Sequence, residues 1–147
     1  MNNSVPTILY VDDDENDVLL LRHAVRSAQL SFNVQVVNDP ENASAYLAGQ
    51  GIYADRKCFP LPELVLLDLK MPRMHGLEVL AWIRSQPVLK RLVVIVLTAS
   101  NQGSEVNRAY ELGANSYLVK PVELEALVEM VKGIGAYWMT LNERPGF

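Results

Sequence analysis

Short apolar runs alternate with amphipathic stretches along the chain, and this alternation constrains the fold more than any other feature of the sequence. Five strand-like segments are predicted at residues 8–11, 34–37, 64–67, 93–97 and 116–119. Three of them read ILYV, LVLL and VVIVL, and such near-continuous apolar runs are typical of strands covered on both faces. The pattern therefore predicts an α/β fold with a parallel sheet between layers of helices.

Each strand-like segment is followed by a stretch with helical periodicity. In the first stretch one apolar face is predicted, made of Val18, Leu19, Leu21, Ala24 and Val25. A second helix is expected from Pro40, with Asp39 as its N-cap. Three more are predicted over 76–84, 105–112 and 122–139. Five successive βα units favour a doubly wound, five-stranded parallel sheet with the flavodoxin-like order 2-1-3-4-5.

The length of 147 residues suits one domain, with an expected core over 7–139 and a short tail over 140–147. The segment 49–62 is longer than a minimal connection needs, so we expect an inserted surface loop. A net charge of −4 provides no electrostatic footprint for nucleic acid. Neither a signal sequence nor a long apolar run is visible, and the single cysteine, Cys58, fits a reducing compartment. We expect a cytoplasmic protein that binds neither nucleic acid nor membrane.

Carboxylates follow two of the predicted strands. Asp12, Asp13 and Asp14 come directly after the first strand, and Asp68 comes directly after the third. In the expected strand order these two strands are neighbours, so their ends lie about 5 Å apart. Converging carboxylates repel one another unless a cation neutralises them, and oxygen ligands suit Mg²⁺. The alternatives are helix capping for residues 12–14 and a turn position for Asp68.

Two further strand ends carry groups that suit a phosphoryl ligand. Thr98 ends the fourth predicted strand and Lys120 follows the fifth. A hydroxyl can donate a hydrogen bond to phosphoryl oxygens and an ammonium can pair with their charge. Taken singly, Thr98 could be a strand-end residue and Lys120 an exposed lysine. Four strand ends that place such groups on one edge favour a phosphoryl site.

Four motifs in fixed order now identify a family resemblance. They are VDD at 11–13, LLDLKMP at 66–72 followed by Gly76, LTAS at 97–100 and YLVKP at 117–121. Together they resemble the receiver domains of two-component response regulators over residues 7–139. The resemblance implies a phosphoacceptor switch and not an enzyme with its own substrate. From the length of 147 residues we expect that no DNA-binding output domain follows.

The resemblance also implies roles for individual residues. Asp68 would accept a phosphoryl group from a sensor histidine kinase. Mg²⁺ or Mn²⁺ would be bound directly by Asp13, by Asp68 and by the backbone carbonyl of Lys70. Asp12 would bind it largely through water. Thr98 would hydrogen-bond the phosphoryl group and Lys120 would pair with it.

Two switch features follow from the same resemblance. The peptide bond between Lys120 and Pro121 is usually cis in this family. Tyr117 would turn inward when Thr98 moves toward the phosphoryl group. The alternative for Tyr117 is a half-buried aromatic residue of the fifth strand.

Finer features are similar to the cyanobacterial phytochrome-type response regulators, which are single-domain receivers. These features are the loop that ends in PLP at 60–62, the run ELGANSYLVKPV at 111–122, and Tyr137 with Trp138. This similarity implies a phytochrome-type kinase, a downstream protein target and a homodimer. The dimer would form through the fourth helix, fifth strand and fifth helix, with Tyr137 and Trp138 at the interface. Alternatively these residues and Met139 pack on their own core.

One position departs from the family pattern. His75 stands where many receivers have Asp, and we expect His75 and His23 to be structural or surface residues.

Two rival functions remain. A carboxylate-nucleophile phosphohydrolase usually has a second Asp two residues after the nucleophile, where this chain has Lys70. An adaptor with this fold but without phosphorylation is the other rival, and the intact acidic set argues against it.

Overall fold

Five parallel strands form one sheet in the computed structural model, which describes residues 5–71 and 75–146. The strands are β1 (Thr7–Val11), β2 (Asn33–Val37), β3 (Leu64–Leu67), β4 (Val93–Thr98) and β5 (Ser116–Val119). Their bounds differ from the prediction by at most one residue at either end. Their order is β2-β1-β3-β4-β5, and every neighbouring pair is parallel. The predicted flavodoxin-like sheet is therefore confirmed.

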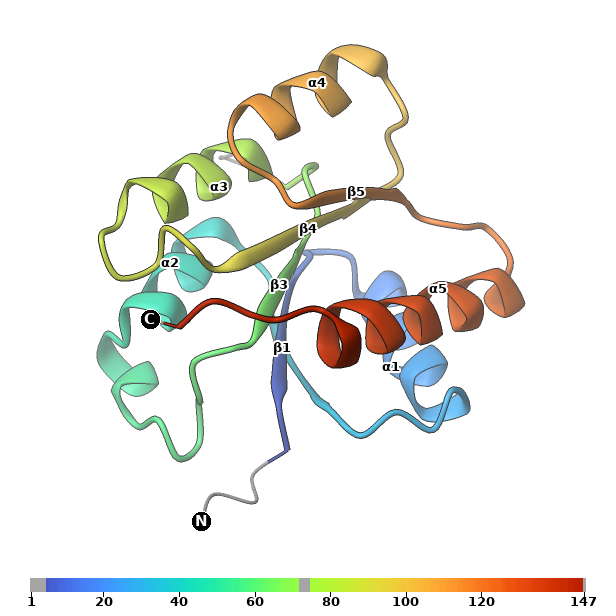
Figure 1. Cartoon of the computed structure of the whole chain (residues 1–147), viewed down its shortest axis with the longest axis horizontal. Helices are drawn as coiled ribbons and strands as arrows, with labels where there is room; N and C mark the ends of the chain where they lie inside the picture. Colours follow the sequence, from blue (N-terminus) through green and yellow to red (C-terminus); the bar gives the residue numbers. More distant parts are fainter. Residues whose placement is uncertain (1–4, 72–74, 147) are drawn as a thin grey trace.

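Helices cover both faces of this sheet (Figure 1). One face carries α1 (Glu15–Ser27) and α5 (Leu124–Ala136), and the other carries α2 (Pro40–Ala48), α3 (Gly76–Ser85) and α4 (Gly103–Glu111). Side chains alternate between the faces because successive residues of a strand point in opposite directions. In β1, Ile8 and Tyr10 pack with α1 and α5, whereas Leu9 and Val11 pack with α2 and α3. This alternation builds one core on each face.

Acidic N-caps fix where the first two helices begin. The Asp14 carboxylate accepts hydrogen bonds from the backbone N–H groups of Asn16 and Asp17, at 2.8 and 3.2 Å. The Asp39 carboxylate accepts one from the Asn42 N–H at 2.7 Å. These three N–H groups lie in the first turns of their helices and would otherwise lack a partner. The predicted cap at Asp39 is confirmed, and capping explains one of the three aspartates at 12–14.

The predicted apolar face of α1 is partly wrong. Leu21, Ala24 and Val25 are buried, but Leu19 is 65% exposed. A helix turns about 100° per residue, so Leu19 lies about 200° away from Leu21. Leu19 therefore points away from the core that Leu21 enters.

The inserted segment 49–62 is packed against α2. It contains the short 3₁₀ helix η1 (Gly51–Ala54), and Arg56 donates hydrogen bonds to the carbonyls of Tyr46 and Leu47 at 2.8 and 3.0 Å. Three aromatic rings with centroids 5.0 to 6.0 Å apart join the segment to the helix: Tyr46, Tyr53 and Phe59. These carbonyls belong to the last turn of α2, where backbone carbonyls lack a partner within the helix, so the guanidinium caps the carboxyl end of α2.

The last helix ends earlier than predicted. After α5 the chain makes a π-helical turn, η2 (Tyr137–Leu141). Gly135 is buried, and a Cβ there would lie 3.1 Å from the side chain of Leu30, so a small residue allows this close approach. Trp138 packs partly against the α1–α5 core, whereas Tyr137 is 52% exposed. In the two described ranges, no helix has the length and apolar character needed to cross a membrane.

Candidate functional site

The carboxyl ends of β1 and β3 lie side by side. Val11 pairs with Leu67 in the parallel register, and the Asp68 N–H donates a hydrogen bond to the Val11 carbonyl at 2.9 Å. The residues that follow these strands therefore share one edge of the sheet. Asp12, Asp13 and Asp68 each place one carboxylate oxygen within 4.8 Å of the others. The predicted convergence of these carboxylates is confirmed.

One ammonium group faces three carboxylates in this crevice. Lys120 Nζ lies 2.7 Å from Asp12 Oδ2, 2.6 Å from Asp17 Oδ2 and 3.4 Å from Asp68 Oδ2. Asp12 is fully buried and Asp68 is 5% exposed, so water screens these charges little. Asp13 is exposed at the mouth of the crevice. A single positive charge cannot balance this acidic cluster, which leaves a place for a cation.

Asp17 is a member of the site that the sequence did not reveal. It lies in the first turn of α1, where an acidic residue also suits the positive end of the helix dipole. The spacing of four residues from Asp13 was no signal, because Asp13 precedes the N-cap Asp14 and lies outside the helix. The hydrogen bond of Asp17 with Lys120, at 2.6 Å, helps to fix the position of the ammonium.

The electrostatics of the site follow from burial. Burial raises the pKa of the Asp68 carboxyl; the Lys120 ammonium opposes this shift and the charge of Asp12 adds to it. Burial alone would lower the pKa of Lys120, but its hydrogen bonds to Asp12 and Asp17 outweigh burial and the pKa is raised. Tyr10 donates a hydrogen bond to Asp12 Oδ2 at 2.5 Å, and burial together with this bond raises the pKa of Tyr10. Lys120 therefore stays charged and Tyr10 stays neutral.

Thr98 brings an unused hydroxyl to the site. It is fully buried at the end of β4, and its Oγ1 has no hydrogen-bond partner among the residues that the structure describes. The hydroxyl is nonetheless close enough to Asp68 to help lower the pKa of that carboxyl. A buried hydroxyl without a partner costs about 1–3 kcal/mol, so it favours binding of a ligand that accepts a hydrogen bond from it. The Lys120 N–H donates to the Thr98 carbonyl at 2.7 Å and ties β5 to this position.

The remaining predicted residues lie around this crevice. Lys70 is exposed, and its N–H is 3.5 Å from Asp68 Oδ1. Tyr117 is partly buried and its hydroxyl donates to the Ser100 carbonyl at 2.9 Å. The expected cis peptide bond before Pro121 is wrong, since that bond is trans, the form that a tertiary amide prefers. Pro72 of the second motif lies outside the described residues.

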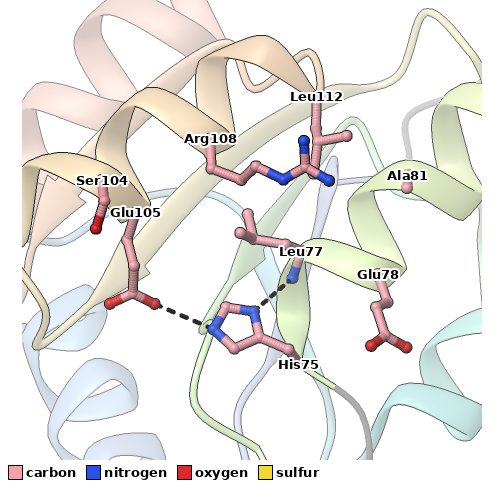
Figure 2. A pocket seen from close by; sticks show the side chains of 8 residues that line it. All are labelled: His75, Leu77, Glu78, Ala81, Ser104, Glu105, Arg108 and Leu112. Carbon is pink, nitrogen blue, oxygen red and sulfur yellow. Dashed lines mark hydrogen bonds and ion pairs between the residues drawn. The ribbon is translucent and has the colours of Figure 1, made fainter.

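His75 links the loop after β3 to α4. Its Nδ1 accepts a hydrogen bond from the Leu77 N–H at 3.1 Å and so caps α3, while Nε2 lies 3.1 Å from Glu105 Oε2 (Figure 2). The other carboxylate oxygen of Glu105 accepts a hydrogen bond from Ser100 Oγ. The structural role expected for His75 is confirmed. Nothing in the sequence pointed to Glu105, because thirty residues separate the pair and neither stands in a motif.

The comparisons with known proteins agree with this geometry. A family model described as the response regulator receiver domain matches residues 8–132. Response regulator Rcp1 of Synechocystis sp. is 38% identical over 138 residues, which span 94% of this chain and 92% of Rcp1. The crystal structure of the Mn²⁺-bound form of Rcp1 matches with a TM-score of 0.83 and 37% identity, over 96% of this chain and 99% of that chain.

Two other solved structures match with higher TM-scores. Response regulator RPA3017, in red light signaling of R. palustris, has a TM-score of 0.92 and 35% identity, over 97% of this chain and 100% of that chain. The phosphorylated cyanobacterial phytochrome response regulator RcpA has a TM-score of 0.88 and 36% identity, with the same coverage of 97% and 100%. The likeness extends over nearly the whole chain.

Proposed function

The chain belongs to the response regulator receiver family, and from this premise we propose that it is a signalling switch in which Asp68 accepts a phosphoryl group from a histidine kinase. One observation carries the proposal. Asp68 sits where an ammonium, an unpartnered buried hydroxyl and two further carboxylates meet. This combination suits an incoming dianionic group with a cation beside it.

Asp12, Asp13 and Asp68, with the backbone carbonyl of Lys70, would hold Mg²⁺ or Mn²⁺. The fit is supported by the three convergent carboxylates, which supply hard oxygen ligands, and by the single ammonium that faces them. When bound, such a cation offsets the negative charge that gathers on the phosphoryl oxygens during transfer. Asp13, as the exposed member, lies where a cation enters from solvent.

In the proposed transfer, a carboxylate oxygen of Asp68 forms a bond to phosphorus and the bond between phosphorus and the kinase imidazole nitrogen breaks. Lys120 would pair with one phosphoryl oxygen and Thr98 would donate a hydrogen bond to another. Thr98 ends β4 and Lys120 follows β5, so both stand at the edge of the sheet that carries Asp68.

We infer that the kinase docks over the start of α1. A cavity of about 340 Å³ opens beside Asp12 and Asp13, and Val18, Leu19 and Val36 line its apolar side. The exposed Leu19 and its apolar neighbours beside the acidic cluster would form a surface that a kinase helix covers while it presents its phosphohistidine. The partner would be a phytochrome-type kinase of the cytoplasm, since the similar protein RcpA is a phytochrome response regulator.

The homodimer also remains a proposal, together with signalling to a downstream protein. Four apolar side chains in and next to α4, β5 and α5 are at least 41% exposed: Tyr110, Val119, Val122 and Tyr137. We infer that they contribute to a surface on which a second copy of the chain docks. Trp138 would contribute less than Tyr137, because part of its ring packs on its own core.

The proposed phosphorylation is tested with a small phosphodonor and Mg²⁺, followed by intact-protein mass spectrometry. The wild type should gain one phosphoryl group and Asp68→Asn should gain none. Asp55→Asn, in the inserted segment, is the matched control and should label like the wild type. Undiminished labelling of Asp68→Asn would discard this assignment.

A further inference from the structure

A chain of three polar side chains, which we call the polar latch, joins the loop after β4 to the start of α3. It consists of Ser100, Glu105 and His75. Ser100 Oγ donates a hydrogen bond to one oxygen of Glu105, and His75 Nε2 lies 3.1 Å from the other (Figure 2). Because His75 Nδ1 accepts the Leu77 N–H, the ring proton lies on Nε2 and is donated to Glu105. Both oxygens of this carboxylate are therefore engaged.

The polar latch holds a part of the molecule that has little apolar anchorage. Of the residues of α4, all of them described, Ala109 alone is buried. A cavity of about 450 Å³ separates α3 from α4, with Leu77 and Arg108 among its lining residues. Packing contributes less than usual to the position of this helix, so the polar contacts at its first turn contribute more.

The other end of α4 is fixed more firmly. Arg84 on α3 donates to the Gly113 carbonyl at 2.9 and 2.7 Å and to Asn115 Oδ1 at 2.9 Å. Asn115 Oδ1 also accepts from the Val94 N–H at 2.8 Å. The carboxyl end of α4 is thus tied to β4, and a movement of the helix would be largest at the end that carries Glu105.

We propose that the polar latch holds the loop after β4 in its unphosphorylated arrangement, and that phosphorylation of Asp68 opens it. This inference rests on the proposed function. Ser100 stands two residues beyond Thr98, whose buried hydroxyl lacks a partner among the described residues. A phosphoryl group on Asp68 supplies that partner, and the movement of Thr98 toward it pulls Ser100 away from Glu105. The bond gained at Thr98 offsets the bond lost at Ser100.

Linkage then predicts the effect of weakening the polar latch. If phosphorylation opens it, removing it must strengthen binding of a phosphoryl mimic by the same free energy. His75→Asp keeps a good N-cap for α3 but places a carboxylate against Glu105. Glu105→Ala removes both hydrogen bonds. Each variant should bind beryllofluoride, in the presence of Mg²⁺, about three- to tenfold more tightly than the wild type.

Matched controls exist for both variants. Glu111→Ala removes an exposed glutamate of the same helix, and His23→Asp replaces an exposed histidine of α1. Both controls should bind beryllofluoride with wild-type affinity. A general loosening of the fold would weaken binding in every variant, so tighter binding confined to the latch variants separates the two explanations.

A second measurement observes the polar latch directly. The chain has two histidines. In a nitrogen NMR spectrum of the imidazole rings, His75 reports on the polar latch and His23 serves as the internal reference. Addition of beryllofluoride and Mg²⁺ should shift the His75 resonances and leave those of His23 in place. The backbone amide of Asp68 reports independently on whether the mimic has bound.

The outcomes distinguish this inference from the function on which it rests. If the Asp68 amide does not respond in the wild type, phosphorylation at this site fails and the polar latch fails with it. If that amide responds while the affinities of His75→Asp and Glu105→Ala equal that of the wild type, the function stands and the polar latch is overturned. The polar latch is supported if both variants bind beryllofluoride more tightly and if the mimic shifts the resonances of His75 but not those of His23.

Discussion

Lys120 Nζ lies 2.7 Å from Asp12 Oδ2 but 3.4 Å from Asp68 Oδ2. The ammonium is therefore hydrogen-bonded to the aspartate that follows β1 and lies farther from the one that follows β3. Asp17 also holds the ammonium, at 2.6 Å. The position of Lys120 is therefore fixed without full neutralisation of Asp68. A phosphoryl group on Asp68 would meet a preorganised cation and would not have to recruit one.

The same arrangement makes the stability of the protein depend on a divalent cation. Mg²⁺ should raise the free energy of unfolding by about 2.7 kcal/mol at one hundred times its Kd, because it binds only the folded acidic cluster. Asp13→Asn should lose most of this increase. Urea unfolding in Mg²⁺ and in a chelator measures both effects.

The control for that variant lies at the next residue. Asp14→Asn changes the same charge, but Asp14 caps α1, and Asn is an equally good N-cap. This variant should keep the full Mg²⁺ effect. Equal stabilisation of Asp13→Asn and the wild type would show that Asp13 is not a ligand.

The exposed Leu19 beside the acidic cluster should contribute to binding of the kinase and not to the reactivity of Asp68. Leu19→Ser should slow phosphotransfer from a phosphorylated histidine kinase about five- to tenfold, as loss of a central apolar contact does. Labelling by a small phosphodonor should be unchanged. The free energy of unfolding should change by about 0.5 kcal/mol or less, since Leu19 is 65% exposed.

Val88→Ser provides the comparison, because Val88 is equally exposed at 65% but lies after α3, away from the acidic cluster. Its phosphotransfer rate should match that of the wild type. A kinase that treats the two variants alike would place the docking surface elsewhere.

Gly76 sets how closely α3 approaches the phosphoacceptor. A Cβ at this position would lie 2.3 Å from the Asp68 carbonyl oxygen and 2.8 Å from Leu69 Cα. Gly76→Ala must therefore displace the backbone that carries Asp68. It should lower the free energy of unfolding by about 2–3 kcal/mol, as overpacking does, and slow labelling of Asp68.

Gly103, at the start of α4, is the matched control. A Cβ there meets nothing within 4 Å. Gly103→Ala should be neutral or stabilising by up to about 1 kcal/mol, because alanine restricts the unfolded chain. Urea denaturation of the two variants decides the matter, and equal stabilities would refute the steric explanation.

The fold and the chemical centre were predictable because both depend on features that repeat along the chain. Apolar runs marked the strands, and the order of a parallel sheet then placed Asp12, Asp13 and Asp68 at one edge. Thr98 and Lys120 followed from the same rule, since each stands at a strand end. Asp39 was predictable as a cap because Pro40 follows it.

The parts that sequence could not supply are contacts between elements that no periodicity relates. Asp17 approaches Lys120 only because α1 and the end of β5 meet, and these residues are 103 positions apart. The contact of Glu105 with His75 depends on how α4 lies beside α3. Leu19 was assigned to the core because it is apolar, although its angle on the helix directs it outward.

The inserted segment 49–62 enters β3, so it lies at the amino-terminal edge of the sheet, whereas Asp68 leaves from the opposite edge. Its aromatic rings and Arg56 anchor it, and it carries the one cysteine of the chain, Cys58, in an exposed position. A thiol-reactive fluorophore can therefore be attached at this cysteine without an added mutation. Such a dye would follow encounters with kinase or target from a site remote from the phosphoacceptor.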